Sequence, residues 1–379
     1  MSALSGGESA GASPLLEVDD LRVSFATEDG IVKAVDGVSF SMRRGEVVAI
    51  VGESGSGKSV SAMTLMGLTR GPNARIEGRA ALDGQELLSM SEADLQRIRG
   101  GSIAMVFQDP MSSLNPVYRI GRQIVEQIRV HDHQISKAAA TDRAVELMER
   151  VGIPRPRERL RSYPHEFSGG MRQRVMIAMA LSCSPKLLIA DEPTTALDVT
   201  IQAQIMSELR SLREETDAGI ILVTHDLGVV ADIADRVLVM YAGRVVEQGT
   251  LDELFYDPQH PYTWGLLKSI PRLDSPRGEE LVPIAGRPPS LIKRPSGCHF
   301  HPRCPYVREE HKKIDPRLEP VPDDPGHSVA CLLPAELRRR IWRGLSEGES
   351  SATLRHLVVE EEQPVRAHAA PRASEDDSA

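Results

Sequence analysis

The stretch GESGSGKS at residues 52–59 constrains the fold of this chain more than any other part of the sequence. Its three glycines within six residues would weaken the interior of a helix or a strand. An apolar run, EVVAIV, leads into it, and a helix-compatible run, SVSAMTLMGL, follows it. In that context the spacing G-x-x-x-x-G-K-S/T predicts a phosphate-binding loop between a strand and a helix. A flexible glycine turn is the alternative, and the Lys-Ser ending argues against it.

The residue types of this loop suit a bound nucleotide. Glycines allow backbone N–H groups to curl around a phosphate, and the start of the following helix adds positive potential. Lys58 is expected to reach the β- and γ-phosphates, and the hydroxyl of Ser59 to bind Mg²⁺. We therefore predict that the loop binds ATP and Mg²⁺ through Gly52, Ser54, Gly55, Ser56, Gly57, Lys58 and Ser59.

From Leu15 to about Val246, short apolar runs alternate with helical patterns. The runs lie at 47–52, 102–108, 186–193, 219–225 and 236–243. This alternation predicts an α/β fold, with a mostly parallel core sheet covered on both faces by helices. The segments LEVDDLRVSF and 32–42 predict an antiparallel β addition, and the pattern between Asn115 and Pro185 is mainly helical.

Composition divides the chain further. Proline becomes frequent after Gly249, and the charged C-terminal end has few apolar residues. The predicted parts are a disordered tail at 1–14, an ATPase domain at 15–258 with a helical subdomain at about 109–185, a C-terminal extension at 259–335, and a helix followed by a disordered tail at 336–379.

Polar residues at the ends of three apolar runs complete the predicted site. Asp191 ends KLLIAD and can bind Mg²⁺, while the adjacent Glu192 can act as general base on the attacking water. Gln108 ends the run SIAMVFQ and can bind Mg²⁺ and sense the γ-phosphate, and His225 ends GIILVTH and can reach the γ-phosphate. Solvated acids and structural polar residues are common at such positions. However, an α/β sheet binds its ligand at the carboxyl ends of its strands, which favours a catalytic role for all of them.

Charge and hydropathy exclude some classes of protein. The net charge of −9 and the pI of about 5.7 argue against a nucleic-acid partner. No apolar run approaches the roughly 18 residues of a membrane helix. The N-terminal residues lack the pattern of a signal peptide. We expect a soluble, intracellular chain that meets the membrane only through a partner.

The segment FSGGMRQR, residues 167–174, resembles the LSGGQ signature of ABC ATPases, with Met171 where glutamine is commonest. The other motifs stand in the order of that family: the loop at 52–59, Gln108, the signature, the acidic pair at 191–192, TALD at 195–198 and His225. The chain is therefore similar to an ABC-type P-loop ATPase, and two further expectations follow from this resemblance.

In ABC ATPases two domains face each other head to tail, and each phosphate loop is closed by the signature of its partner. The resemblance implies that Ser168, Gly169 and Gly170 contact the γ-phosphate held by a second subunit. It also implies that Phe25 stacks on adenine and that Asp198 shapes the dimer interface.

Three further stretches, at 108–121, 198–205 and 260–271, resemble the ATP-binding subunits of bacterial dipeptide/oligopeptide importers, a branch that includes nickel importers. The resemblance implies an ATPase that energises peptide uptake from the cytoplasmic face of the membrane. Its partners would be a second ATPase subunit, as a heterodimer with a paralogue, two membrane permeases that dock near Met111–Pro116, and an external solute-binding protein. No nucleic-acid partner is implied.

Other functions stay open at this point. Nickel or another solute is an alternative cargo within the same branch. A soluble ABC ATPase of translation or DNA repair is a less favoured alternative, because the former usually carries two ATPase domains and the latter a long coiled coil. The HPYT stretch at 260–263 argues against an exporter.

The C-terminal part contains a further set of candidate ligands: Cys298, Cys304, His311 and Cys331. Many members of the branch carry a cysteine in place of His311, and their four cysteines look like ligands of an iron–sulfur cluster. Three cysteines and a histidine can bind a 4Fe–4S cluster or Zn²⁺. Packed cysteines without a metal are the alternative, and His299 and His301 are additional candidate ligands. Cys183 lies in an apolar helical run and is expected in the core.

Overall fold

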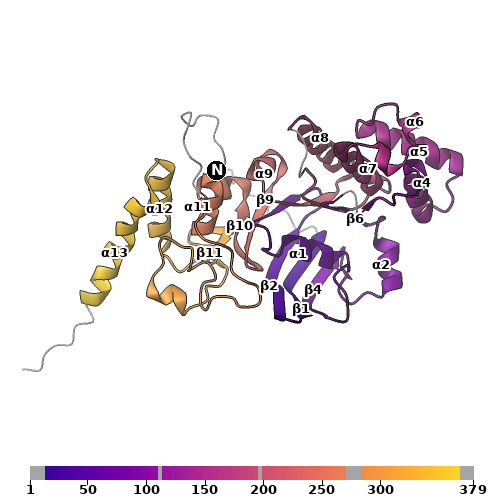
Figure 1. Cartoon of the computed structure of the whole chain (residues 1–379). Helices are drawn as coiled ribbons and strands as arrows, with labels where there is room; N and C mark the ends of the chain where they lie inside the picture. The colour runs from indigo at the N-terminus through magenta and orange to yellow at the C-terminus, as the bar shows by residue number, and fades with distance from the viewer. Residues whose placement is uncertain (1–12, 110–112, 195–198, 270–282, 368–379) are drawn as a thin grey trace, which may run out of the picture. The chain divides into compact units, whose positions relative to one another are not determined.

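The computed structural model describes residues 13–109, 113–194, 199–269 and 283–367, with side chains as far as residue 359 (Figure 1). It contains two compact units, Met1–Arg244 and Val245–Ala379. The predicted ATPase domain ended at residue 258, whereas the second unit begins earlier. The reason is that strand β10 (Arg244–Thr250) pairs with β12 (Asp324–Val329) of the C-terminal unit.

The core of the first unit is a parallel sheet with the order β9-β3-β8-β7-β6. Its strands are β3 (Val47–Val51), β6 (Ile103–Val106), β7 (Leu187–Asp191), β8 (Gly219–Thr224) and β9 (Arg236–Tyr241). Nearly every residue in them is buried, as expected for a parallel sheet covered on both faces. The predicted α/β fold is confirmed, because each strand arises from one of the continuous apolar runs.

The helices that follow these strands pack back onto the sheet. Helix α1 (Lys58–Leu65) packs against β7 and β8, and α9 (Leu227–Ile233) against β3 and β8. Helix α8 (Val199–Thr216) packs against α9. Since each loop between a strand and its helix opens at the same edge of the sheet, the polar residues in these loops are brought together there.

A second, antiparallel sheet in the same unit has the order β2-β1-β4-β5. The predicted pair is present as β1 (Leu16–Thr27) and β2 (Gly30–Met42). Strands β4 (Ala74–Leu82) and β5 (Gln85–Glu86) were not predicted from the sequence. Strand β4 begins with exposed and half-buried residues and buries only its last three, so its apolar alternation is weak. Helix α2 (Glu92–Ile98) follows and is capped by the hydroxyl of Ser91.

The segment between β6 and β7 is mainly helical, as expected. It contains α4 (Ile120–His131), α5 (Lys137–Arg150), α6 (Pro156–Arg159), a short 3-10 turn (Pro164–Glu166) and α7 (Gly169–Leu181). On α4, Ile120, Ile124 and Ile128 recur every fourth residue and are buried on one face. Cys183 was expected inside the helical run, but it lies after the end of α7 and is half-buried.

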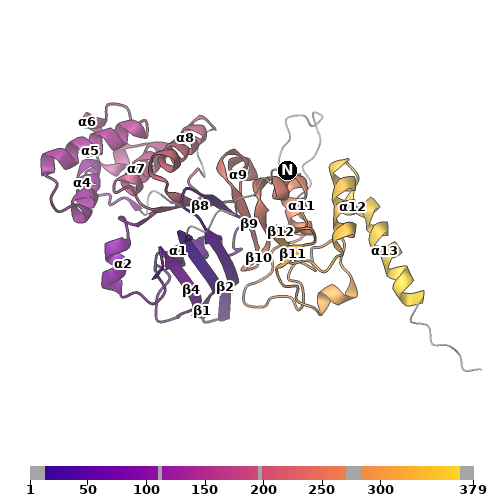
Figure 2. The same cartoon turned by 180° about the vertical axis from the view of Figure 1, so that it is seen from behind.

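The C-terminal unit combines the antiparallel strands β11 (Glu319–Val321), β12 and β10 with α10 (Leu251–Tyr256), α11 (Pro261–Lys268), a 3-10 turn (Glu309–Lys312), α12 (Ala335–Ser346) and α13 (Ser351–Ala367) (Figures 1 and 2). Its aromatic and aliphatic core consists of Trp264, Tyr306, Leu333, Leu337, Ile341, Leu345, Leu354 and Val358. Among the described helices, none combines the length and the hydropathy needed to span a bilayer.

Helix α13 corrects one expectation. The sequence predicts one helix and then a disordered tail over 336–379, whereas Ser351–Ala367 forms a second helix after α12. Its few apolar residues include Leu354, Leu357 and Val358, whose spacing places them on one face, where they pack against the core that contains Ile341 of α12. Low apolar content misled the prediction because the apolar residues that are present share one side of the helix.

Candidate nucleotide-binding site

At two of its glycines, the loop between β3 and α1 approaches neighbouring backbone too closely for a side chain. A Cβ atom at Gly52 (φ 151°) would lie 2.2 Å from the carbonyl oxygen of Met240. A Cβ atom at Gly57 (φ 103°) would lie 2.4 Å from the carbonyl oxygen of Ala34. Positive φ and close packing therefore require glycine at both positions.

Gly57 is also the N-cap of α1, and no side chain caps this helix. Its first N–H groups therefore have no side-chain acceptor, as expected of a helix start that binds an anion. Ser54 and Gly55 are exposed at the tip of the loop. Ser56 is buried, and its hydroxyl has no hydrogen-bond partner among the described residues.

Lys58 lies inside the loop that it follows. Its Nζ donates hydrogen bonds to the carbonyl oxygens of Gly52 (2.7 Å) and Glu53 (3.0 Å). Burial lowers the pKa of Lys58, while the nearby carboxylates of Glu192 and Asp191 act in the opposite direction. The predicted phosphate-binding cation is thus held beside both acidic residues.

Ser59 and Asp191 meet at the carboxyl end of β7. The Ser59 hydroxyl donates to Asp191 Oδ1 at 2.9 Å, and Asp191 is 4% exposed. Burial raises the pKa of Asp191, partly offset by the Ser59 hydrogen bond. Two adjacent oxygen ligands of this kind suit Mg²⁺, so the residues present fit the predicted ion.

Glu192 lies between two other predicted residues. Gln108 Nε2 donates to Glu192 Oε2 at 2.8 Å, and His225 Nδ1 lies 3.2 Å from Glu192 Oε1. These residues follow the adjacent strands β6, β7 and β8. Glu192 has a φ of +48°, which is unusual for a residue with a side chain and is typical of strain at functional sites. The carboxylate is therefore held in one orientation from both sides.

The signature lies at the start of α7. The Ser168 hydroxyl accepts a hydrogen bond from the backbone N–H of Met171 at 3.3 Å and caps the helix. Ser168 and Gly169 are exposed, and Gly170 is half-buried. Helix α7 packs mainly against α4, α5, α8 and β6, whereas α1 packs against strands.

Two predicted residues are less informative. Phe25 is half-buried near the end of β1, opposite Val32 of β2 and Ala74 of β4. Asp198 and the rest of TALD lie outside the described residues, as does Met111.

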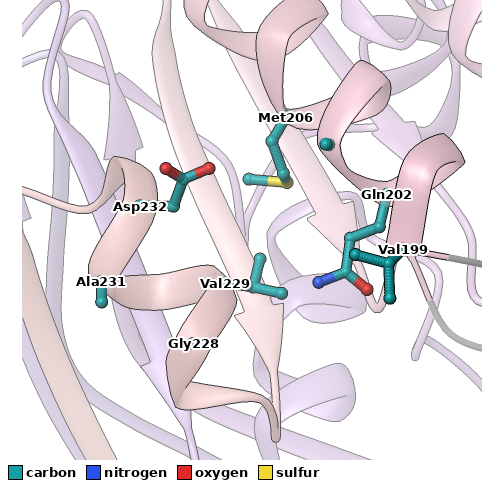
Figure 3. Close-up of a pocket in the computed structure, with 8 residues that line it drawn as sticks. Val199, Gln202, Met206, Gly228, Val229, Ala231 and Asp232 are labelled. Atoms are coloured by element: carbon teal, nitrogen blue, oxygen red, sulfur yellow. The ribbon is translucent and has the colours of Figure 1, made fainter. Parts of the chain in front are cut away.

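A pocket between α8 and α9 has a volume of about 310 Å³ (Figure 3). Its lining consists of Val199, Gln202, Ala203, Met206, Gly228, Val229, Ala231 and Asp232. None of the residues predicted to bind nucleotide lines it, so it is separate from the candidate site.

The predicted metal ligands of the C-terminal unit are brought together around one small cavity. Its lining includes Cys298, Cys304, His311, Cys331, His260, Phe300 and His301. All described cysteines are free thiols. Burial raises the pKa of each lining cysteine, to about 11 for Cys331.

The orientation of His311 does not fit the role predicted for it. Its Nδ1 accepts a hydrogen bond from the backbone N–H of Arg308 at 3.0 Å, so the proton of a neutral ring is on Nε2. A histidine that binds a metal usually shows the opposite arrangement, with its other nitrogen donating to an acceptor. His301 has that arrangement, because its Nδ1 lies 3.0 Å from the carbonyl oxygen of Cys298 and must donate to it.

Sequence reasoning missed one central residue of this unit, Glu247. Its fully buried carboxylate accepts hydrogen bonds from the backbone N–H groups of Gln259 and His260, from the Thr263 hydroxyl, and from His327. It therefore anchors the HPYT segment at the start of α11. A single glutamate in a strand gives no sequence signal of such a role.

Two known families match parts of this chain. The family described as "ABC transporter" matches residues 35–195, and the one described as "Oligopeptide/dipeptide transporter, C-terminal region" matches residues 246–310. The ATP-binding cassette MJ0796, solved as a dimer bound to ADP and Pi, is 27% identical with a TM-score of 0.57 and covers 62% of this chain and 98% of its own. CbiO1 of Clostridium perfringens is 30% identical with a TM-score of 0.54 and covers 65% and 92%.

Curated relatives are more similar. The oligopeptide transport ATP-binding protein OppD of Salmonella typhimurium is 54% identical over 325 residues, which cover 86% of this chain and 95% of that protein. The dipeptide transport ATP-binding protein DppD of Bacillus subtilis is 54% identical over 320 residues, covering 84% and 94%. The chain therefore belongs to the family of ATP-binding subunits of oligopeptide and dipeptide ABC transporters.

Proposed function

We propose that this chain hydrolyses ATP through Glu192 and that hydrolysis drives uptake of oligopeptides or dipeptides by an ABC importer. The observation that carries the proposal is the position of the Glu192 carboxylate. Gln108 and His225 hold this carboxylate by hydrogen bonds. Its negative charge acts to raise the pKa of both Lys58 and Asp191, so both side chains lie near it.

Binding of ATP rests on the loop and its lysine. The N–H groups at the start of α1 face the phosphates, and Lys58 exchanges its loop carbonyl acceptors for phosphate oxygens. Ser59 and Asp191 hold Mg²⁺, which when bound neutralises charge on the β- and γ-phosphates. Phe25 offers a partly exposed ring for adenine.

Hydrolysis rests on Glu192. Its carboxylate accepts a proton from the water that attacks the γ-phosphorus, and the bond from this phosphorus to the bridging oxygen of ADP breaks. Gln108 and His225 orient the carboxylate through their hydrogen bonds, and His225, which is 60% exposed, also faces the phosphate.

A second ATPase subunit completes the site. Ser168, Gly169 and Gly170 are accessible at the start of α7, where the helix N-terminus attracts an anion. They contact the γ-phosphate bound by the other subunit. Two membrane permeases and an external solute-binding protein are the remaining partners, so the chain works at the cytoplasmic face of the membrane.

We also propose an iron–sulfur cluster for the C-terminal cavity, held by Cys298, Cys304 and Cys331, with His301 in place of His311 as the nitrogen ligand. Tetrahedral zinc would hold three thiolates about 4 Å apart. Among the described residues, the only group with three candidate ligand atoms within 4.8 Å of one another is Glu253, Asp324 and His327, which contains no cysteine. The three thiols are therefore not spaced for a single zinc ion, and the cluster remains the group that the resemblance implies. Iron and sulfide content after anaerobic purification should fall in His301→Ala and stay unchanged in His311→Ala; the reverse result restores the role of His311.

The transport function is tested by uptake of labelled peptides into cells that lack this chain. We expect the wild-type chain and Glu146→Gln, an exposed control on α5, to restore uptake, and Glu192→Gln to fail at the same expression level. Full uptake with Glu192→Gln would show that Glu192 is not the general base of ATP hydrolysis. Unchanged peptide uptake in the deletion strain, together with loss of nickel uptake, would replace the proposed cargo.

A further inference from the structure

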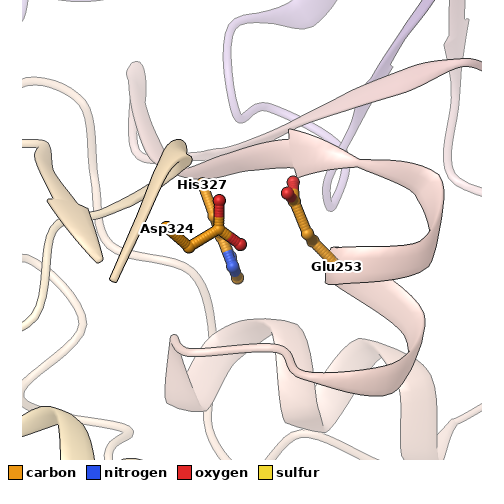
Figure 4. Close-up of side chains that lie close together, drawn as sticks. All are labelled: Glu253, Asp324 and His327. Atoms are coloured by element: carbon orange, nitrogen blue, oxygen red, sulfur yellow. The ribbon is translucent and has the colours of Figure 1, made fainter. Parts of the chain in front are cut away.

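Three side chains that no motif singles out meet in the C-terminal unit. Glu253 of α10 and Asp324 and His327 of β12 place one potential ligand atom each within 4.8 Å of one another (Figure 4). Figure 4 shows the two carboxylates turned toward each other, with the His327 ring beside Asp324. Acidic residues often gather at surfaces without binding anything, so the histidine is the informative member of this group.

His327 is completely buried, and its neighbours fix its tautomer. Its Nε2 lies 2.9 Å from Oε1 of Glu247, which is also completely buried. That carboxylate also accepts from two backbone N–H groups and from the Thr263 hydroxyl, as an ionised, acceptor-only group does, so it has no proton to donate to the ring. Nε2 therefore carries the proton that it shares with Glu247, and the lone pair of the neutral ring is on Nδ1.

The Nδ1 atom of His327 is the unexplained group. It is buried and has no hydrogen-bond partner among the described residues. Buried polar atoms of proteins nearly always have a partner, so this nitrogen requires either a proton or a cation. An imidazole whose other nitrogen donates to a carboxylate is the usual arrangement of a metal-binding histidine.

The two carboxylates have oxygen atoms to spare. Glu253 uses Oε2 to accept from the N–H of Thr250 at 2.6 Å, as part of the capping box of α10. Its other oxygen, Oε1, faces the same space as Asp324 Oδ1. A Cβ atom at Gly326 would lie 3.8 Å from the former and 3.6 Å from the latter. Both side chains are only half-buried, so they can move closer to an ion.

We propose that Glu253 Oε1, Asp324 Oδ1 and His327 Nδ1 bind a divalent cation. One imidazole nitrogen and two carboxylate oxygens suit a metal of the Mn²⁺ or Zn²⁺ kind. Glu247 acts as a positioning residue, because it holds the ring with Nδ1 unprotonated. The ion ties the start of α10 to the hairpin that leads into β12, and this role is independent of ATP hydrolysis.

The test uses Mn²⁺ alone with the full chain at pH 7.5 and without nucleotide, followed by electron paramagnetic resonance. Mn²⁺ is chosen because thiolates compete poorly for it, which limits binding at the cysteine cavity. We compare the wild-type chain with Asp324→Asn and with the matched control Asp323→Asn, an exposed neighbour outside the cluster.

We expect one saturable site in the wild type and the control, and binding weakened by roughly 10- to 100-fold in Asp324→Asn. The bound Mn²⁺ should show coupling to a directly coordinated imidazole ¹⁴N, which a surface carboxylate site or the Ser59–Asp191 pair would not give. Equal binding in all three chains, or bound Mn²⁺ without ¹⁴N coupling, overturns the proposal and leaves His327 as a protonated partner of Glu247.

Discussion

Replacement of Glu247 by glutamine tests how the C-terminal unit is held together. In the wild type, Oε1 accepts from the Gln259 N–H and from His327, while Oε2 accepts from the His260 N–H and from the Thr263 hydroxyl. A glutamine amide must place its NH₂ group at one of these two oxygen positions. At either position it faces a backbone N–H, which cannot accept from it.

The magnitude follows from the less costly orientation. With NH₂ in the place of Oε2, the Thr263 hydroxyl can turn and accept, and only the N–H of His260 loses its acceptor. One buried donor without a partner costs about 1–3 kcal/mol. Loss of charge from the remaining hydrogen bonds adds on the order of 1 kcal/mol. We therefore expect Glu247→Gln to destabilise the unit by about 2–4 kcal/mol.

Tryptophan fluorescence gives a selective assay, because both tryptophans of the chain, Trp264 and Trp342, belong to the C-terminal unit. With a urea m-value of about 2 kcal/mol/M, the unfolding midpoint should fall by roughly 1–2 M without a change in slope. The matched control is Glu319→Gln, an exposed residue of β11. A shift in Glu247→Gln no larger than in this control would refute the proposed anchoring of α11.

Three further predictions concern the nucleotide loop, the catalytic residue and the cysteine cavity. Glu192→Gln should keep ATP affinity and lower phosphate release by roughly 10²- to 10⁴-fold in the assembled transporter, and normal turnover would contradict its role as general base. Gly57→Ala forces a Cβ atom to within 2.4 Å of the Ala34 carbonyl oxygen at a φ of 103°. The Kd for a fluorescent ATP analogue should therefore rise about tenfold or more. An unchanged Kd would show that the loop does not need its present shape to bind the nucleotide. Burial raises the pKa of Cys331 to about 11, so its thiol is mostly protonated below that pH. The rate of its alkylation in the metal-free chain should therefore rise about tenfold from pH 8 to pH 9. A rate that levels off near about pH 8.5 would instead indicate a thiol of ordinary pKa.

The core of the first unit could be predicted because its strands are continuous apolar runs that end in polar residues. In a parallel sheet those ends share one edge, so Gln108, Asp191, Glu192 and His225 were expected together before any contact was known. The hydrogen bonds of Gln108 and His225 to the Glu192 carboxylate are geometric details that the sequence does not contain.

The C-terminal unit was less predictable because its contacts depend on side-chain orientation. The sequence brings cysteines and histidines into one region, but only the hydrogen bonds of the two rings make His301 a better candidate ligand than His311. Glu247 and His327 are separated by 80 residues and belong to no motif that indicates pairing. Helix α13 was missed because average composition hides the spacing of its few apolar residues.

The central claim is that ATP is enclosed between Lys58 of this chain and the signature of a second ATPase subunit, while Ser168 of this chain serves the partner. The most direct measurement is sedimentation of Glu192→Gln mixed with the companion subunit from the same transporter, with and without ATP. We predict that ATP converts the mixture to a stable pair and that adding Lys58→Ala or Ser168→Arg to the Glu192→Gln chain prevents this. Pairing that does not depend on ATP, or that persists in both variants, would contradict the account.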